Sequence, residues 1–135
     1  AGMGPDALET FTPPAMGADV NLAEAKRRIG DKVCMIGGFD QGHYFMGCSE
    51  EDTRKAVRRC FEEAGAGGGY ILCPSDHFFD GEHRLVKAFV EEAHRCVYPA
   101  ADCPCPSTEC ENHGHCAACR RHHEDEGVKP PYCQR

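Results

Sequence analysis

Three strand-like runs, each followed by an amphipathic stretch, occupy the first 98 residues and limit what this chain can fold into. The strand-like runs are residues 6–10, 32–36 and 70–73, and the amphipathic stretches are residues 22–29, 49–64 and 82–96. Regular alternation of strand and helix is typical of βα units, whose strands pair in parallel because each helix returns the chain to the same end of the sheet. The sequence therefore predicts an α/β fold with a parallel sheet.

The predicted helices carry signals for where they begin and end. Asn21 followed by Glu24 resembles a capping box, and Ser49 followed by Asp52 forms an S-x-x-D cap. Gly30 is expected to end the first helix in the left-handed conformation that glycine adopts at low cost. These signals predict helices that begin just after residues 21 and 49.

The second strand runs into two glycines. Residues 32–36 are apolar enough to be covered on both faces of a sheet, and Gly37 and Gly38 follow at once. Because glycine tolerates backbone conformations closed to other residues, we expect the chain to turn sharply there or to approach another segment closely.

The strand–helix pattern stops at Pro99. From residue 100 onward no periodic apolar pattern remains, and prolines at positions 104, 106, 130 and 131 are expected to prevent any long helix or strand. Cysteines and histidines crowd into this segment, whereas the other five cysteines are scattered through the first 98 residues. We therefore expect two parts, residues 1–98 and an irregular Cys/His-rich module at residues 99–135.

The cysteines and histidines of this module have the spacing of metal ligands. Cys116 and Cys119 form a CxxC pair followed by His123, and a tight pair of thiolates suits a tetrahedral ion. The predicted ligands are Cys103, Cys105, Cys110, Cys116, Cys119, His123 and Cys133. Zinc is the expected metal. An iron–sulfur cluster is an alternative, although the spacing matches no ferredoxin run, and an oxidised or disordered appendage is another.

Charge and composition argue against several classes of function. Acidic residues outnumber basic ones by 22 to 15, and a net charge of −7 opposes binding to nucleic acid. No apolar run approaches the ~20 residues of a membrane-spanning helix, and the first residues lack the pattern of a signal peptide. Scattered thiols beside one dense cluster fit a reducing compartment. We therefore expect a cytoplasmic protein without a nucleic-acid or membrane partner.

Polar residues follow each predicted strand, where parallel sheets carry their functional groups. Glu9 lies at the end of the first strand, Asp40 and His43 follow the second, and Asp76 and His77 follow the third. Each residue alone has a structural explanation, as a turn cap or as half of a surface ion pair. Their joint placement at three strand ends makes them the candidate catalytic residues.

Residues 4–96 resemble the C-terminal third of the uroporphyrinogen decarboxylase superfamily, which includes cobalamin-dependent methyltransferases. The resemblance rests on the segments DALETFTPP, NLAEAKRRIGDKVCMIGGFDQ, EEDTRKAVRRCFEEAG, GGGYILCPSDHFF and LVKAFVEEA. It implies a (β/α)8 TIM barrel, of which this chain would hold the last three units. Because a complete barrel takes about 250 residues, the chain would depend on a missing N-terminal barrel half or on a second chain.

The resemblance implies one of two activities. Decarboxylases of the family carry Gly-His-Gly after the last strand to orient the porphyrinogen, and zinc-dependent methyltransferases carry a cysteine ligand there. Here Asp76 falls at the ligand position and His77 one place beyond, while Cys73 on the strand is expected in the core. Because Gly-His-Gly is missing, we favour the methyltransferase type, with a corrinoid protein as partner. The alternatives are a porphyrin-biosynthetic decarboxylase and a non-catalytic barrel remnant whose zinc module mediates assembly.

Overall fold

The computed structural model describes residues 4–97, 103–125, 127 and 129–132, without the side chains of residues 116–118. The chain divides into two compact units, residues 1–90 and residues 91–135. The division falls within helix α4 (His83–Val97), the last helix of the predicted βα units.

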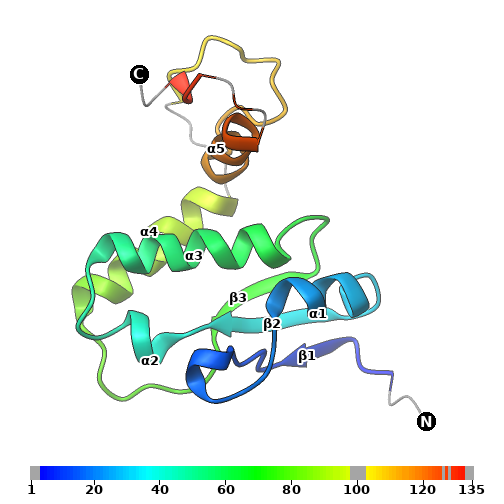
Figure 1. The fold of residues 1–135 in the computed structure, drawn as a ribbon, viewed down its shortest axis with the longest axis vertical. Helices are drawn as coiled ribbons and strands as arrows, with labels where there is room; N and C mark the ends of the chain where they lie inside the picture. Colours follow the sequence, from blue (N-terminus) through cyan, green and yellow to red (C-terminus); the bar gives the residue numbers. More distant parts are fainter. Residues whose placement is uncertain (1–3, 98–102, 126, 128, 133–135) are drawn as a thin grey trace. The chain divides into compact units, whose positions relative to one another are not determined.

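The first unit is built on a three-stranded parallel sheet (Figure 1). Its strands lie in the order β1 (Ala7–Glu9), β2 (Cys34–Phe39) and β3 (Tyr70–Pro74). The connections between them carry a short 3-10 helix η1 (Pro14–Met16) and the helices α1 (Leu22–Ile29), α2 (Gln41–Tyr44) and α3 (Glu50–Ala64). Parallel pairing of strands that follow one another along the chain confirms the predicted α/β fold and fits a partial barrel.

Both predicted helix starts are confirmed. The side chain of Asn21 accepts a hydrogen bond from the backbone N–H of Glu24 at 2.9 Å. Ser49 and Asp52 form a complete capping box, because the Ser49 hydroxyl accepts from the Asp52 N–H and the Asp52 carboxylate accepts from the Ser49 N–H. Caps of this kind are local, which is why the sequence predicts them well.

The conformation of Gly30 and the end of the second strand differ from the predictions, whereas the expected close approach of another segment at Gly37 and Gly38 is confirmed. Gly30 ends α1 in the right-handed conformation, with a φ of −67°. Strand β2 does not stop before Gly37 and Gly38 but continues through both to Phe39, because β3 pairs with this whole stretch. The glycines are still needed for conformation and space: their φ angles are 122° and 85°, and a Cβ on Gly38 would lie 2.8 Å from the Leu22 side chain.

An aromatic cluster closes the core at the carboxyl end of β2. The rings of Phe39, Phe45 and Phe89 lie with centroids 4.6–5.4 Å apart in tilted or edge-to-face contact. Met35 of β2 and Leu85 of α4 are also fully buried. Buried apolar area of this kind is what holds a sheet against its helices.

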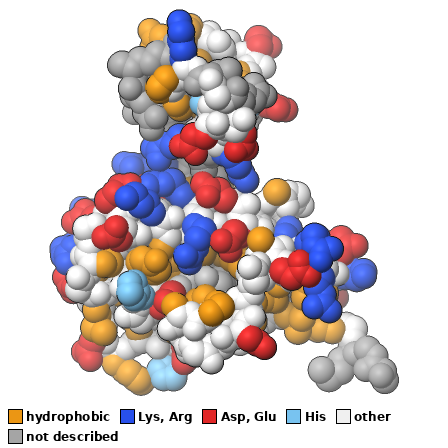
Figure 2. Space-filling view, viewed as in Figure 1, with side chains coloured by type: hydrophobic (Ala, Val, Ile, Leu, Met, Phe, Trp, Pro, Cys, Tyr) orange, Lys and Arg blue, Asp and Glu red, His pale blue; other side chains and the backbone are white. Residues whose placement is uncertain are grey.

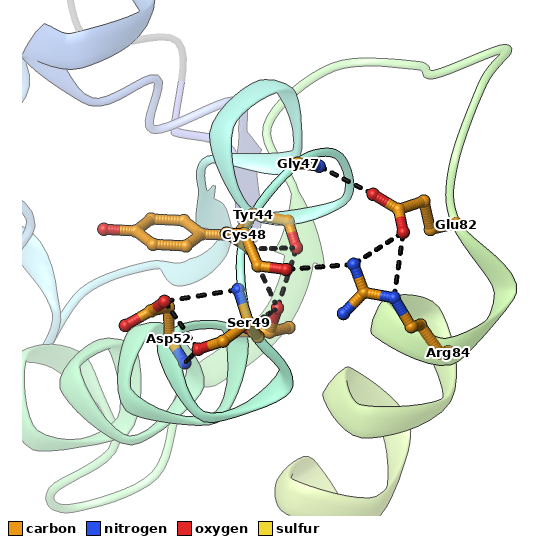
Figure 3. Close-up of polar contacts among 8 residues, drawn as sticks. Tyr44, Gly47, Cys48, Ser49, Asp52, Glu82 and Arg84 are labelled. Carbon is orange, nitrogen blue, oxygen red and sulfur yellow. Dashed lines mark hydrogen bonds and ion pairs between the residues drawn. The ribbon is translucent and has the colours of Figure 1, made fainter.

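The loop between α2 and α3 is tied to the start of α4 by a small polar network, which we call the Glu82 contact (Figure 3). The N–H of Gly47 donates to the Glu82 carboxylate at 2.7 Å, and the Arg84 guanidinium bonds to the same carboxylate and to the carbonyl of Cys48. The Gly47 N–H and then the Arg84 guanidinium lower the pKa of Glu82. This contact holds in place the loop after α2, the short helix that follows the carboxyl end of β2.

The second unit contains the helix α5 (Cys116–Asp125), so the prediction of an irregular module is wrong for these ten residues. The prolines that were expected to prevent helix formation all lie outside this segment. The helix begins where the carbonyl of His115 accepts from the N–H of Cys119 at 2.9 Å. Neither α5 nor any other helix in the described part of the chain is long and apolar enough to cross a membrane.

Acidic and basic side chains are interspersed over the helices on the face that Figure 2 shows. A protein that binds nucleic acid gathers its basic side chains into a patch or stripe. This face offers no support for such a partner, and the absence of a nucleic-acid partner stays a prediction.

Candidate functional site

The five candidate residues lie at or just beyond the carboxyl ends of the strands but fall into two groups. Glu9, Asp76 and His77 line one pocket, which we call the strand-end pocket. Asp40 and His43 line a different pocket. The structure therefore brings together three of the five candidates and separates the other two from them.

The strand-end pocket lies at the ends of β1 and β3 and has a volume of about 460 Å3. Its lining consists of Glu9, Thr10, Cys73, Pro74, Ser75, Asp76, His77 and Phe78. Strand β2 lies between β1 and β3. Residues more than 60 positions apart in the sequence share one pocket because parallel pairing puts the carboxyl ends of β1 and β3 at the same edge of the sheet.

Asp76 and His77 form an ion-pair contact at the mouth of this pocket. The Nδ1 atom of His77 lies 2.7 Å from Oδ1 of Asp76, which also accepts the backbone N–H of His77 at 2.8 Å. A carboxylate held against one ring nitrogen fixes the tautomer of an imidazole and leaves the other nitrogen to exchange a proton. Both side chains are more than half exposed, so a ligand can reach them. The pair can act as a general acid or base.

Thr10, which follows Glu9, also lines the pocket and has a backbone conformation that the sequence did not predict. It is the one described residue other than glycine with a positive φ, 63°, and it follows directly after β1. Left-handed backbone is strained for a β-branched residue, and strain of about 1–3 kcal/mol persists where surrounding structure imposes it, often at functional sites. No local sequence signal marks the position, because threonine disfavours this conformation.

Cys73 is half-buried and lines the same pocket, although the sequence predicted a core position. Burial raises the pKa of its thiol, and the nearby Glu9 carboxylate raises that pKa further. The thiol is therefore held in its protonated form and is a weak nucleophile.

Ser75 and Gln41 hold the ends of β2 and β3 together, and the sequence gave no sign of this. The Ser75 hydroxyl accepts from the N–H of Gly38 at 3.0 Å, and the Ser75 N–H donates to the Gln41 side-chain oxygen at 3.1 Å. Both residues are buried. Because Asp76 follows Ser75 directly, these bonds position the start of the Asp76–His77 segment.

Asp40 has a structural partner within its own loop. Its side chain is 3% exposed and accepts the N–H of His43 at 2.9 Å, which caps the short helix α2. His43 is exposed and lies edge-on to the ring of Tyr44, with centroids 5.0 Å apart. This geometry matches the turn-cap alternative for Asp40, and a catalytic role of either residue stays a prediction.

The predicted metal ligands lie in the second unit. Cys103, Cys105, Cys110, Cys119 and His123 line a pocket of about 400 Å3 there. Within the described part of the chain, no three histidine, cysteine or acidic side chains are gathered closely enough to hold an ion. The side chain of Cys116 and all of Cys133 lie outside the described residues. The metal site thus stays a prediction.

Comparison with known families identifies the class of protein. The family model described as uroporphyrinogen decarboxylase (URO-D) matches residues 10–96, which is more than half of the chain. The match includes the carboxyl ends of β2 and β3, and Glu9 at the end of β1 lies just before it. The chain belongs to this family, as the resemblance in the sequence indicated.

Three curated relatives of the chain are named uroporphyrinogen decarboxylase. The chain is 34% identical over 84 residues to the uroporphyrinogen decarboxylase of Thioalkalivibrio sulfidiphilus, covering 60% of this chain and 23% of the relative. It is 33% identical over 104 residues to the enzyme of that name from Cupriavidus necator, covering 70% and 27%, and 35% identical over 60 residues to that of Pseudoalteromonas translucida, covering 43% and 16%. The chain thus spans about a quarter or less of each relative. No solved structure matches it significantly.

Proposed function

We propose that this chain is the C-terminal segment of a decarboxylase that acts on uroporphyrinogen once the rest of the barrel is present. The curated relatives carry the name of that enzyme, which supports the alternative over the methyltransferase type favoured from the sequence. A corrinoid partner was expected only with methyl transfer and has no part in this proposal. Zinc likewise has no role at the strand ends in it.

The observation that carries the proposal is the acid–base set in the strand-end pocket. Decarboxylation breaks the bond between a carbon and its carboxylate, releases CO2 and leaves an electron pair on that carbon, which then takes up a proton. His77, in contact with Asp76 at 2.7 Å, is suited to deliver that proton. Glu9 lines the same pocket and can take part in the relay.

The strand-end pocket supplies only part of what such a substrate needs. A porphyrinogen bears several carboxylates, which Arg and Lys bind best. Among the described residues that line this pocket, none is Arg or Lys. The proposal therefore assigns the binding of the remaining carboxylates to barrel units that precede this segment in the family.

Exposed residues on the edge strands of the sheet support the need for those barrel units. All three residues of the edge strand β1 are exposed, with Leu8 37% exposed, and Ile71 of β3 is 52% exposed. Exposed apolar residues on strands beside open edges mark surfaces that pair with another chain or segment. The proposed partner is the missing barrel half, on the same polypeptide or on a second one.

The test is reconstitution of a barrel from two pieces. The full chain would be co-expressed with the Cupriavidus necator relative lacking its own matching C-terminal part, and CO2 release from uroporphyrinogen would be measured. We expect activity from the pair and from neither piece alone. The relative's own C-terminal part serves as the positive control. If that control restores activity while this chain binds the partner without turnover, the non-catalytic barrel remnant is the better account.

A pair of histidine variants separates chemistry from assembly. We expect His77→Gln to lower turnover of the reconstituted enzyme at least about a hundredfold, the lower end of what a general acid contributes. His83→Gln changes an exposed histidine at the start of α4 outside the pocket and is expected to leave turnover unchanged. Equal activity of the two variants would rule out the role assigned to His77.

A further inference from the structure

We propose that the second unit binds one zinc ion through Cys119 and His123 of α5 and two thiolates from residues 103–110. The side chains that could ligate a metal around its pocket are Cys103, Cys105, Cys110, His113, Cys119, His122 and His123. No residue of this set belongs to the strand-end pocket. The zinc proposal and the decarboxylase proposal can therefore fail independently.

Helix α5 supplies two ligands on one face. Cys119 and His123 are four residues apart, and residues at this spacing lie one above the other on a helix. Both are half-buried and line the pocket. A helical pair four residues apart is a proven geometry for two zinc ligands, because one turn of helix holds their side chains at a fixed separation.

His123 also carries an unsatisfied ring nitrogen. Its Nδ1 atom is buried and has no hydrogen-bond partner in the part of the chain that the structure describes. A buried polar atom without a partner costs about 1–3 kcal/mol. A metal bound at the imidazole would satisfy this nitrogen directly or orient the ring so that it reaches water.

The remaining two ligands are assigned to the loop before α5. Cys103, Cys105 and Cys110 are free thiols that line the pocket. His113 is left out of the ligand set because its Nε2 lies 3.1 Å from the carbonyl oxygen of Cys105 and is already engaged there. Two loop thiolates with Cys119 and His123 give the four ligands of a tetrahedral site.

The chemistry of these ligands selects zinc among the common metals. Thiolate sulfur and imidazole nitrogen suit zinc, whereas magnesium and calcium take oxygen ligands. On binding, each ligating thiol loses its proton to solvent and a sulfur–zinc bond replaces the sulfur–hydrogen bond. Metal uptake therefore releases protons and is weaker at low pH.

Binding would also order the unit. In the described part of the chain, the proposed ligands do not lie close enough together to hold an ion. Binding must therefore draw the loop toward α5. Gly114 and Pro131 are the only buried residues among those described in residues 103–132, so apolar burial contributes little here. In such segments the free energy of metal binding supplies the free energy of folding.

Metal content of the full chain tests the proposal. The chain would be purified in reductant and equilibrated with zinc, and bound metal would be measured by elemental analysis. We expect about one zinc per chain, and cobalt in its place should show the visible absorption of a tetrahedral thiolate site. Less than about half an equivalent of zinc, or iron with sulfide in its place, would overturn the proposal.

Matched variants locate the site. Cys119→Ser and His123→Gln are expected to lower bound zinc at least tenfold, whereas Cys34→Ser, in β2, is expected to bind as the parent does. Removing zinc with a chelator should speed amide exchange in residues 103–125 and leave α3 unchanged, which separates loss of the site from loss of the whole fold. Zinc binding by both variants at the parent level would contradict the ligand assignment.

Discussion

Single residues at the strand ends determine what the pocket can do. The Asp76–His77 contact is suited to supply a proton. Ser75 comes directly before this pair, and its hydroxyl accepts a hydrogen bond from the N–H of Gly38. Thr10, which lines the same pocket, has a strained left-handed backbone with a φ of 63°. Strain at one residue can be measured directly, because glycine at the same position would relieve it.

We expect Thr10→Gly to raise the free energy of unfolding by up to about 1 kcal/mol. The reason is that the free-energy cost of holding threonine in the left-handed conformation exceeds the cost of the extra entropy that glycine gives the unfolded chain. Thr12→Gly is the matched control. Thr12 lacks a positive φ, so glycine there should lower the free energy of unfolding by about 0.4–1 kcal/mol. Urea unfolding of both variants measures the difference. A loss of stability in Thr10→Gly as large as in Thr12→Gly would contradict the strain.

At the scale of elements, local caps and one long-range contact set the helices in place. The Ser49–Asp52 capping box starts α3, and the Glu82 contact joins the loop before α3 to the start of α4. The cap could be read from the sequence because its partners are three residues apart. The Glu82 contact could not, because Gly47 and Glu82 are brought together only by the fold.

The Glu82 contact predicts a dependence of stability on pH. The pKa of Glu82 in the folded chain lies below its ordinary value of 4.5, so its ionised form is favoured by folding. The stability that it contributes is complete above about pH 4.5 and is lost as the pH falls through the folded pKa. We expect Glu82→Gln to be less stable than the parent at pH 7, and to lose less stability than the parent between pH 5 and pH 3.

Thermal unfolding at a series of pH values measures this effect. Asp80→Asn removes an exposed carboxylate from the same loop and is the control, expected to follow the parent curve more closely than Glu82→Gln does. The pKa values of Asp52 and Glu24 are also lowered, because Ser49 and Arg27 respectively bind their carboxylates. Every variant is therefore expected to lose some stability at low pH. A parallel pH curve for Glu82→Gln and the parent would refute the assigned role.

At the scale of the whole molecule, the first unit is a three-stranded parallel sheet with open edges, which fits a partial barrel. The strand order β1-β2-β3 leaves β1 and β3 at the two edges of the described sheet. In a closed barrel no strand has a free edge. We therefore expect the edge strands of the isolated chain to pair with those of another copy.

We expect the isolated chain to elute from gel filtration as more than a monomer, with the size increasing with concentration. Leu8→Lys places a charge on the exposed edge strand and should shift the chain toward monomer. Ala23→Lys adds the same charge on the exposed surface of α1 and should leave the size unchanged. A parent chain that remains monomeric at high concentration would show that the edge needs no partner.

The sequence alone determined the local and repetitive features of this protein. The existence of three strands, the helix caps and the family could all be predicted, because apolar runs and capping residues are signals that extend over a few positions. The end of β2 could not, because pairing with β3 extends that strand to Phe39. The sequence did not predict the ten-residue helix α5, because prolines are frequent on both sides of this segment although none lies within it. Within the candidate site, the sequence identified the right strand ends but not which residues share a pocket.

Only the tertiary structure decided that Glu9 shares a pocket with Asp76 and His77 while Asp40 and His43 line another pocket. Likewise, only the fold revealed the strain at Thr10 and the bonds that hold Ser75. The physical reason is that these relations depend on strand order and on the packing of segments distant in the sequence. A local pattern of residue types contains no information about which distant backbone will supply the partner.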